Sequence, residues 1–189
     1  MKFESRFGVI FCFRNPVKIL QNKLYRFIFF SALLYLGWLF IYEYWLHPLG
    51  FLDRAMIDNI IWATSNLLEL LSFNLIGDFP FDEGIRTVGI DGTHGVWVGD
   101  PCNGISLFAL FTGFVLAYPG PVKHKLWYIP LGLILIHVIN VIRVTALVMI
   151  VYYAPEYLEF NHTYTFTLFV YGFVFLMWWY WASRLSTRS

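Results

Sequence analysis

Long apolar runs constrain this chain more than any other feature of its sequence. Residues 27–46, 103–118 and 163–182 are each apolar enough to cross a bilayer core of about 30 Å as helices that rise about 1.5 Å per residue. A fourth run, residues 126–153, is longer than one crossing requires, so we expect it to tilt, to kink at Pro130 or to project beyond the lipid. The runs predict an all-α polytopic membrane protein with about four transmembrane helices.

The composition favours a bilayer environment. Apolar residues make up 59% of the 189 residues and aromatic residues 21%, whereas charged residues make up only 13%. The charged share is about half that of an ordinary soluble domain, and a soluble monomer of this kind would expose large apolar patches. Because the length leaves room for one domain, we treat residues 1–189 as a single integral membrane domain.

The basic residues predict which segments lie on each side of the membrane. Ten of the 13 lysines and arginines lie before residue 27, between residues 118 and 126, or after residue 182. Segment 47–102 instead carries two arginines and eight carboxylates, a net charge of −6. Since cytoplasmic segments collect Lys and Arg, we expect residues 1–26 and both termini in the cytoplasm and segment 47–102 outside. The expected location is the inner, cytoplasmic membrane of the cell.

Two elements are expected within the outer segment. Residues 55–77 combine isoleucines and leucines at helical spacing with interrupting polar residues, which predicts an amphipathic helix in the membrane interface. A crossing by this helix would reverse the charge assignment, but the sequence leaves both placements open. Between residues 85 and 98, alternating residues around Asp91-Gly92 predict a short extracytoplasmic hairpin, which leads toward Cys102.

Three polar residues from separate parts of the chain are expected at one depth. Cys102 lies 17 residues before Pro119 and Arg143 lies 18 residues after Lys125, so each is about 26 Å above the turn that joins their helices. His162 lies about 20 residues from the aromatic end of the last run, which is the same level. We therefore expect a thiol, a guanidinium and an imidazole to meet at the extracytoplasmic rim of the bilayer.

The two cysteines differ in their sequence context. A cysteine is often an inert, buried residue, but Cys102 follows Pro101 at the expected start of a helix. Free backbone N–H groups and the helix dipole favour a thiolate there. Cys12, in the basic N-terminal segment, has no such setting. Because the chain has only these two cysteines, a disulfide framework and a Cys-based zinc site are excluded.

Arg143 and His162 each allow a plain and a chemical interpretation. Arg143 lies in apolar sequence, where it could snorkel to headgroups or join a structural ion pair. It could instead hold the thiolate and donate to an oxyanion, oriented by Asn140 one turn deeper. An interfacial histidine can be satisfied by water, but beside Cys102 it would act as general acid and base. His137 competes for this role, yet it points about 120° away from Arg143 near mid-membrane, so we prefer His162.

These residues together resemble a known family. Residues 96–105 contain a Cys-x-Gly-Ile pattern, an Asn-x-x-Arg pattern ends at Arg143, and His162 opens the last run. This set is similar to the exosortase and archaeosortase family of membrane cysteine transpeptidases, over roughly residues 85–182. The resemblance implies that Cys102 is the nucleophile, Arg143 its cationic partner and His162 the acid/base residue. The chain resembles a compact member that lacks the extra N-terminal spans.

The resemblance also implies a substrate and a reaction. Family members process exported surface proteins whose C-terminal sorting signal comprises a short motif, a membrane helix and a basic tail. A thioester on the cysteine would be resolved by an amine, in a transpeptidase, or by water, in a protease. Asn103, which stands where the family commonly has Ser, and Asn140 would support the site by hydrogen bonding. The expected partners are the lipid bilayer and a membrane-anchored protein substrate, with no cofactor, metal ion or nucleic acid.

The residues alone leave a second function open. In a non-enzymatic integral subunit of an export or polysaccharide assembly complex, Cys102 would be inert and Arg143 would belong to an ion pair between packed helices. The substrate protein, its cleavage motif, the acceptor and the oligomeric state do not follow from the sequence.

Overall fold

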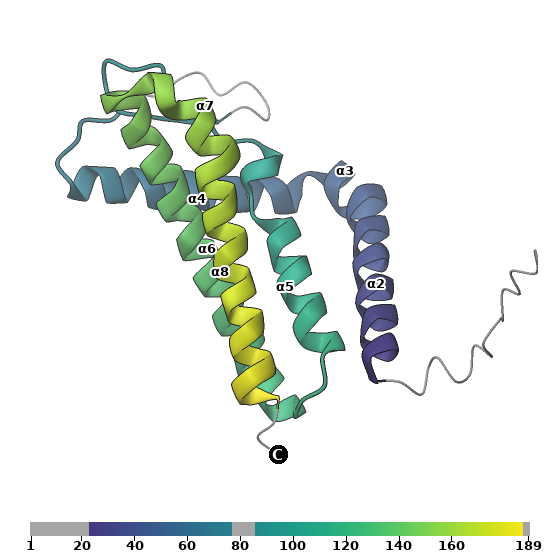
Figure 1. Ribbon diagram of the computed structural model, residues 1–189. Coiled ribbons are helices and arrows are strands. Elements are labelled where there is room, and N and C mark those ends of the chain that lie inside the picture. The colour runs from purple at the N-terminus through teal and green to yellow at the C-terminus, as the bar shows by residue number, and fades with distance from the viewer. Residues whose placement is uncertain (1–22, 77–85, 187–189) are drawn as a thin grey trace, which may run out of the picture.

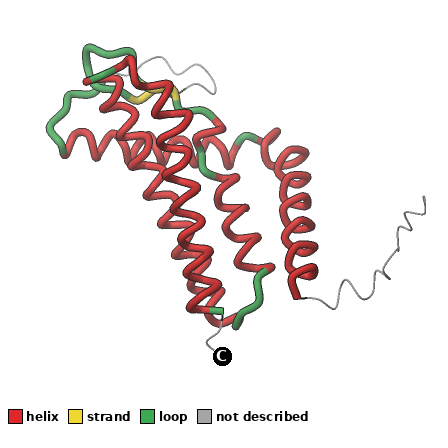
Figure 2. Tube along the Cα trace, viewed as in Figure 1, coloured by secondary structure: helices red, strands yellow, loops and turns green. Residues whose placement is uncertain are grey.

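The computed structural model describes residues 23–76 and 86–186. Its helices form an elongated bundle with one helix lying across it (Figure 1). The main elements, in chain order, are α2 (Lys23–Ile41), α4 (Phe51–Leu70), α5 (Ile105–Ala117), α6 (Val122–Tyr153) and α8 (Phe166–Tyr180). The only strands in the described residues are β1 (Thr87–Val88) and β2 (Val96–Trp97), so the predicted all-α class is confirmed (Figure 2).

Three helical segments are long and apolar enough to cross a membrane. They are Leu24–Leu49, Val122–Tyr153 and Pro155–Leu185. The first joins α2 to a π-helical turn (Tyr42–Leu46) and α3 (His47–Leu49), and the last joins a 3-10 turn (Pro155–Tyr157), α7 (Leu158–Phe160) and two π-helical turns (Asn161–Thr165 and Trp181–Leu185) to α8. With 13 residues, α5 is only about 20 Å long, so the expected span 103–118 is shorter than a full crossing. The expected count of four spans is therefore approximate.

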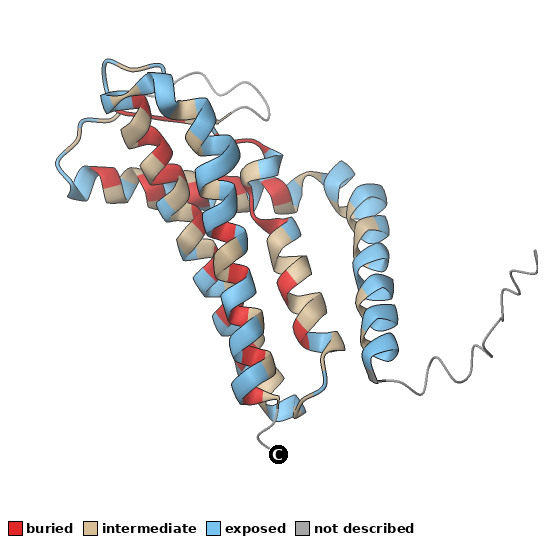
Figure 3. Ribbon diagram, viewed as in Figure 1, coloured by how far each residue is buried: buried red, intermediate tan, exposed pale blue. Residues whose placement is uncertain are grey.

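The helix expected at residues 55–77 is present as α4, with different bounds. Gly50 adopts a left-handed φ of 61° that ends α3, and the next residue begins α4. One face of α4 is buried at helical spacing while the other is exposed, as the prediction of an amphipathic helix requires (Figure 3). In Figure 1 α4 runs across the bundle instead of along it. Residue 77 lies outside the described residues.

The predicted hairpin is also present. Strands β1 and β2 are antiparallel, with Thr87 opposite Trp97 and Val88 opposite Val96. The loop between them includes Gly92, at a φ of 83°. An ion pair between Arg86 and a carboxylate of α4, that of Asp58, ties the hairpin to α4. Position 85, where the predicted hairpin begins, lies outside the described residues.

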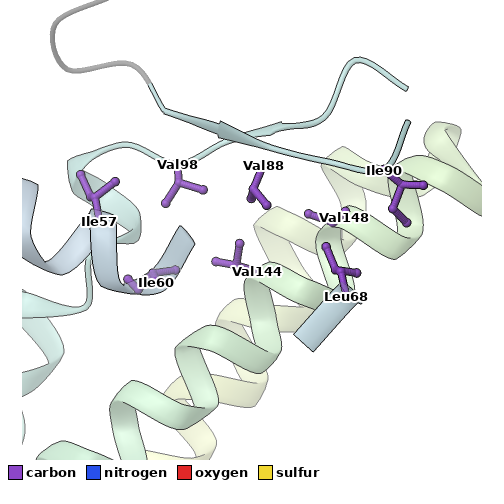
Figure 4. Packing of buried hydrophobic residues seen from close by; sticks show 8 residues of the cluster. All are labelled: Ile57, Ile60, Leu68, Val88, Ile90, Val98, Val144 and Val148. Atoms are coloured by element: carbon purple, nitrogen blue, oxygen red, sulfur yellow. The ribbon is translucent and has the colours of Figure 1, made fainter. Parts of the chain in front are cut away.

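Two clusters of buried apolar side chains hold the fold together. The first joins α4, the hairpin and the second half of α6, and it consists of aliphatic residues: Ile57, Ile60, Leu68, Val88, Ile90, Val98, Val144 and Val148 (Figure 4). The second joins α5, α6 and the C-terminal helix, and it includes three large aromatic residues: Phe111, Tyr128 and Trp181. The clusters lie toward opposite ends of the molecule.

We name these ends by what lies there. The hairpin end holds α4, the hairpin and α7, and the turn end holds the start of α2, the α5 to α6 turn and the end of the C-terminal helix (Figure 1). Lys123, Lys125 and Arg184 lie at the turn end with the start of α2. The chain thus passes between the two ends in α2, α5, α6 and α8, and both ends of its described part lie at the turn end.

Candidate active site

Cys102 lies in a short 3-10 turn (Asp100–Cys102) just before α5. Its N–H group donates to the Gly99 carbonyl at 2.9 Å, and the N–H group of Asn103 donates to the Asp100 carbonyl at 3.2 Å. The first residue of α5 is Ile105. The expectation that Cys102 opens the helix among free N–H groups is therefore corrected, because Cys102 precedes α5 by three residues and these N–H groups have acceptors.

Asn103 connects the Cys102 turn to α4. The side chain is buried, and its Oδ1 accepts a hydrogen bond from the Ile105 N–H at 2.9 Å, which caps α5. Its Nδ2 donates to Asp53 Oδ1 at 2.6 Å. The predicted supporting residue thus links the cysteine turn to the start of α5 and to α4. Its partner on α4, Asp53, entered the sequence analysis only as one of the eight carboxylates of segment 47–102.

Asn140 holds the same turn from α6. Its Nδ2 donates to the Cys102 carbonyl oxygen at 2.7 Å, and its side chain is 1% exposed. The sequence analysis expected Asn140 to orient Arg143, but the structure gives its amide nitrogen to Cys102 instead. Gly104, at a φ of 81°, lets the chain pass close to this amide, since a Cβ there would lie 3.3 Å from Asn140 Nδ2. The peptide unit after Cys102 is therefore held by α6.

Cys102 and His162 line one cavity of about 590 Å³. The hairpin supplies one wall, including Val96 and Trp97, and α6 supplies another, including Leu147. Cys102 is partly buried and is not in a disulfide, whereas His162, in the π-helical turn that leads into α8, is exposed. A largely apolar cavity with a few polar groups on its walls is typical of a ligand-binding pocket.

Arg143 lines a second, smaller cavity of about 210 Å³, together with Asn103 and Asn140. The two cavities share Pro101. The Nε atom of Arg143 is buried and has no hydrogen-bond partner within the described residues. The Oδ1 atom of Asn140 is likewise buried and has no partner among them. Arg143 thus lies on a cavity that adjoins the one lined by the thiol of Cys102.

The structure therefore brings the three predicted residues to one end of the bundle without placing them around a single cavity. Cys102 and His162 share the larger cavity, and Arg143 occupies the adjoining one. The competing histidine, His137, is instead engaged with α4, where its Nε2 lies 2.8 Å from Asn59 Oδ1. Cys12 lies outside the described residues.

Asp53 is the polar residue of this region that the sequence analysis missed. It is 3% exposed, although it is a carboxylate in the first turn of α4. A sequence signal does exist, because Asp53 occupies the same helical register as the buried face of α4, which continues with Ile57, Ile60, Thr64 and Leu68. An acidic residue on the apolar face of an amphipathic helix is expected to have a specific partner.

The sequence analysis expected no metal ion at this site. Within residues 23–76 and 86–186, histidine, cysteine and carboxylate side chains form no group of three or more that could hold a metal ion. The polar side chains at the two cavities are the thiol of Cys102, the imidazoles of His94 and His162, the carboxylate of Glu159, the guanidinium of Arg143, two carboxamides and several hydroxyl groups.

The fold and this end of the bundle define a multi-pass α-helical membrane protein with a cysteine and a histidine on one cavity. A family model, described as transmembrane exosortase (Exosortase_EpsH), matches residues 16–180, which is most of the chain. The chain belongs to the transmembrane exosortase family. A search of curated proteins and a search of solved structures each returned no match. The family resemblance found in the sequence is thus confirmed.

Proposed function

We propose that this protein is an exosortase-like membrane cysteine protease or transpeptidase that processes the C-terminal sorting signals of surface or exported proteins. The observation that carries the proposal is the shared cavity, because the thiol of Cys102 and the imidazole of His162 line the same space of about 590 Å³. Family membership supports the same function. The cavity is also large enough to accept several side chains of an extended peptide.

In the proposed mechanism, the Cys102 thiolate attacks the carbonyl carbon of the scissile peptide bond. His162 accepts the thiol proton and then donates it to the departing amine, so that the C–N bond breaks and a thioester remains on the sulfur. Arg143, which lines the adjoining cavity, stabilises the negative charge on the tetrahedral oxygen. An amine or a water molecule then attacks the thioester and regenerates the thiol.

Asn103 and Asn140 support the nucleophile in this proposal. Asn103 ties the Cys102 turn to α4, and Asn140 ties the same turn to α6. Neither side chain therefore needs to contact the substrate. Their hydrogen bonds fix the backbone on both sides of the peptide unit that follows the thiol. A nucleophile fixed in this way loses little entropy on reaching the attack geometry.

We further propose that the hairpin end faces the extracytoplasmic side of the inner membrane. The charge pattern supports this orientation, since Lys123, Lys125 and Arg184 lie at the turn end and segment 47–102 has a net charge of −6. A substrate anchored by a C-terminal membrane helix would then present its motif at the level of Cys102. No charge attraction is expected between its basic tail and the basic turn end.

The proposal is tested by co-expressing candidate substrates with the wild-type protein and with Cys102→Ala. The wild-type protein should shorten a substrate that bears a sorting signal and change its membrane retention, and Cys102→Ala should abolish both effects. Cys12→Ala is the matched control and should process normally. Processing that persists in Cys102→Ala would remove the nucleophile assignment and favour a non-enzymatic subunit of an export or polysaccharide assembly complex.

A further inference from the structure

We propose that Asp53 is a positioning residue for Cys102, acting through the side chain of Asn103. This inference rests on the proposed function, and it adds a residue that lies 49 positions before the cysteine in the sequence. Asp53 does not line the cavity that holds the thiol. Its influence must therefore pass through the groups that its carboxylate contacts.

The first step is the burial of the carboxylate. A carboxylate with 3% exposure is costly unless hydrogen bonds replace its water. Oδ1 of Asp53 accepts hydrogen bonds from the Tyr42 hydroxyl and from Asn103 Nδ2, both at 2.6 Å, and Oδ2 lies 3.3 Å from His47 Nδ1. The site is thus built around the carboxylate by groups from the end of the first span, from α3 and from the cysteine turn.

The second step is the orientation of the Asn103 amide. A carboxylate only accepts hydrogen bonds, so Asn103 must turn its Nδ2 toward Asp53. Its Oδ1 then faces the Ile105 N–H, from which it accepts at 2.9 Å. The reverse orientation would set an oxygen against the carboxylate and a donor against the N–H group. Asp53 therefore determines how Asn103 caps α5.

The third step leads from Asn103 to the thiol. The peptide unit that joins Cys102 to Asn103 is held on its carbonyl side by Asn140 Nδ2, at 2.7 Å. The Asn103 side chain anchors the other side of the same unit to α4 through Asp53. If that anchor is lost, the turn keeps its internal hydrogen bonds and its contact with Asn140 but loses its connection to α4, so it can shift. A displacement of about 1 Å at a reacting atom can cost about 100-fold in rate.

The experiment measures KM and kcat, with kcat expressed per titrated Cys102, for wild type, Asp53→Ala, Asn103→Ala and the double variant. Each single variant should lower kcat by about 10- to 100-fold and leave KM nearly unchanged. The double variant should be no slower than the slower single variant, because both substitutions remove the same contact. Losses that multiply in the double variant, or an unchanged kcat per titrated Cys102 in Asp53→Ala, would overturn the proposal.

Two further variants separate positioning from simple stability. Asp53→Asn should recover most of kcat, because its amide oxygen can accept the same bond from Asn103. Tyr128→Phe removes a buried hydrogen bond at the turn end, from the Tyr128 hydroxyl to the Met177 carbonyl, so it should lower the melting temperature without lowering kcat. If Tyr128→Phe loses as much kcat as Asp53→Ala, the loss reflects stability alone and the proposal is wrong.

A readout without substrate distinguishes this inference from the proposed function. If the wild-type protein and Cys102→Ala process a substrate equally, the proposed function fails, and Asp53 is then judged by the alkylation of Cys102 with a small impermeant thiol reagent. Asp53→Ala should change that alkylation rate several-fold, whereas Tyr128→Phe should not. Equal rates in wild type and Asp53→Ala would overturn the positioning role.

Discussion

The two ends of the molecule are held together in different ways. At the turn end, three helices pack directly through large rings, as in the stack of Phe114 on Trp178 with centroids 4.5 Å apart. At the hairpin end, a crosswise helix, a hairpin and a 3-10 turn meet around small aliphatic side chains and buried polar groups. Cavities lie at both ends, including one of about 360 Å³ beside Lys125 at the turn end, but the two that are lined by Cys102, Arg143 and His162 lie at the hairpin end.

This difference indicates a division between scaffold and site. Substitutions at the turn end should change the stability of the protein without changing its chemistry. At the hairpin end, Arg143 carries a buried Nε with no partner in the described residues, so its removal should cost little stability and much activity. The three predictions below test this division, from the largest expected effect to the smallest.

Arg143→Ala should have the largest effect, and only on turnover. Loss of an oxyanion donor lowers kcat by about 10²- to 10³-fold, while the stability of the protein changes by less than about 1 kcal/mol because no hydrogen bond of Arg143 Nε is lost. The measurement pairs single-turnover processing with thermal unfolding in detergent.

Lys125→Met is the control at the turn end. The Lys125 Nζ donates to the Leu116 and Tyr118 carbonyls at 2.8 and 2.9 Å, so this substitution should lower stability and leave kcat unchanged. A loss of stability alone in Arg143→Ala, together with a loss of kcat in Lys125→Met, would contradict the division between scaffold and site.

Gly132→Ala should destabilise the turn end by about 1 to 3 kcal/mol. An added Cβ on α6 would collide with the ring of Phe111 on α5, in the middle of the aromatic cluster. Thermal unfolding measures the loss, and kcat per folded molecule should stay at the wild-type value. Gly172→Ala on α8 is the matched control, since a Cβ there meets nothing within 4 Å. Equal destabilisation by the two substitutions would contradict the packing described here.

Tyr128→Phe should have the smallest effect, a loss of about 0.5 to 1.5 kcal/mol in stability. The buried Tyr128 hydroxyl donates to the Met177 carbonyl at 2.8 Å, which links α6 to α8. Tyr35→Phe, on the exposed side of α2, serves as the comparison in the same unfolding assay and should leave stability unchanged. A loss of kcat in Tyr128→Phe would show that the turn end is coupled to the site.

The bundle could be predicted from the sequence because its signals are strong and local. Run length and apolar composition identified the long helices, and the basic residues grouped the segments that share the turn end. The bounds of α4 were harder, because Asp53 and Arg54 looked like residues before a helix. They lie inside its first turn because Gly50, at a φ of 61°, ends the preceding helix and lets α4 begin at Phe51.

The site could be predicted only in part, for a geometric reason. Counting residues along helices gives depth, and it correctly directed attention to one end for Cys102, Arg143 and His162. It does not give the direction in which each side chain points around its helix relative to another helix. Arg143 consequently lies on a neighbouring cavity, and Asp53, counted only toward the negative charge of segment 47–102, is buried against Asn103.

The central claim is that Cys102 carries the substrate as a thioester, and hydroxylamine tests it most directly. Hydroxylamine attacks thioesters, so processing in its presence should leave a hydroxamate at the new C-terminus of the substrate, detectable by mass spectrometry. The account predicts that the hydroxamate fraction rises with hydroxylamine concentration in the wild-type protein and that Cys102→Ala gives none. A product that keeps a plain carboxylate at every hydroxylamine concentration, or a hydroxamate formed equally by Cys102→Ala, would contradict it.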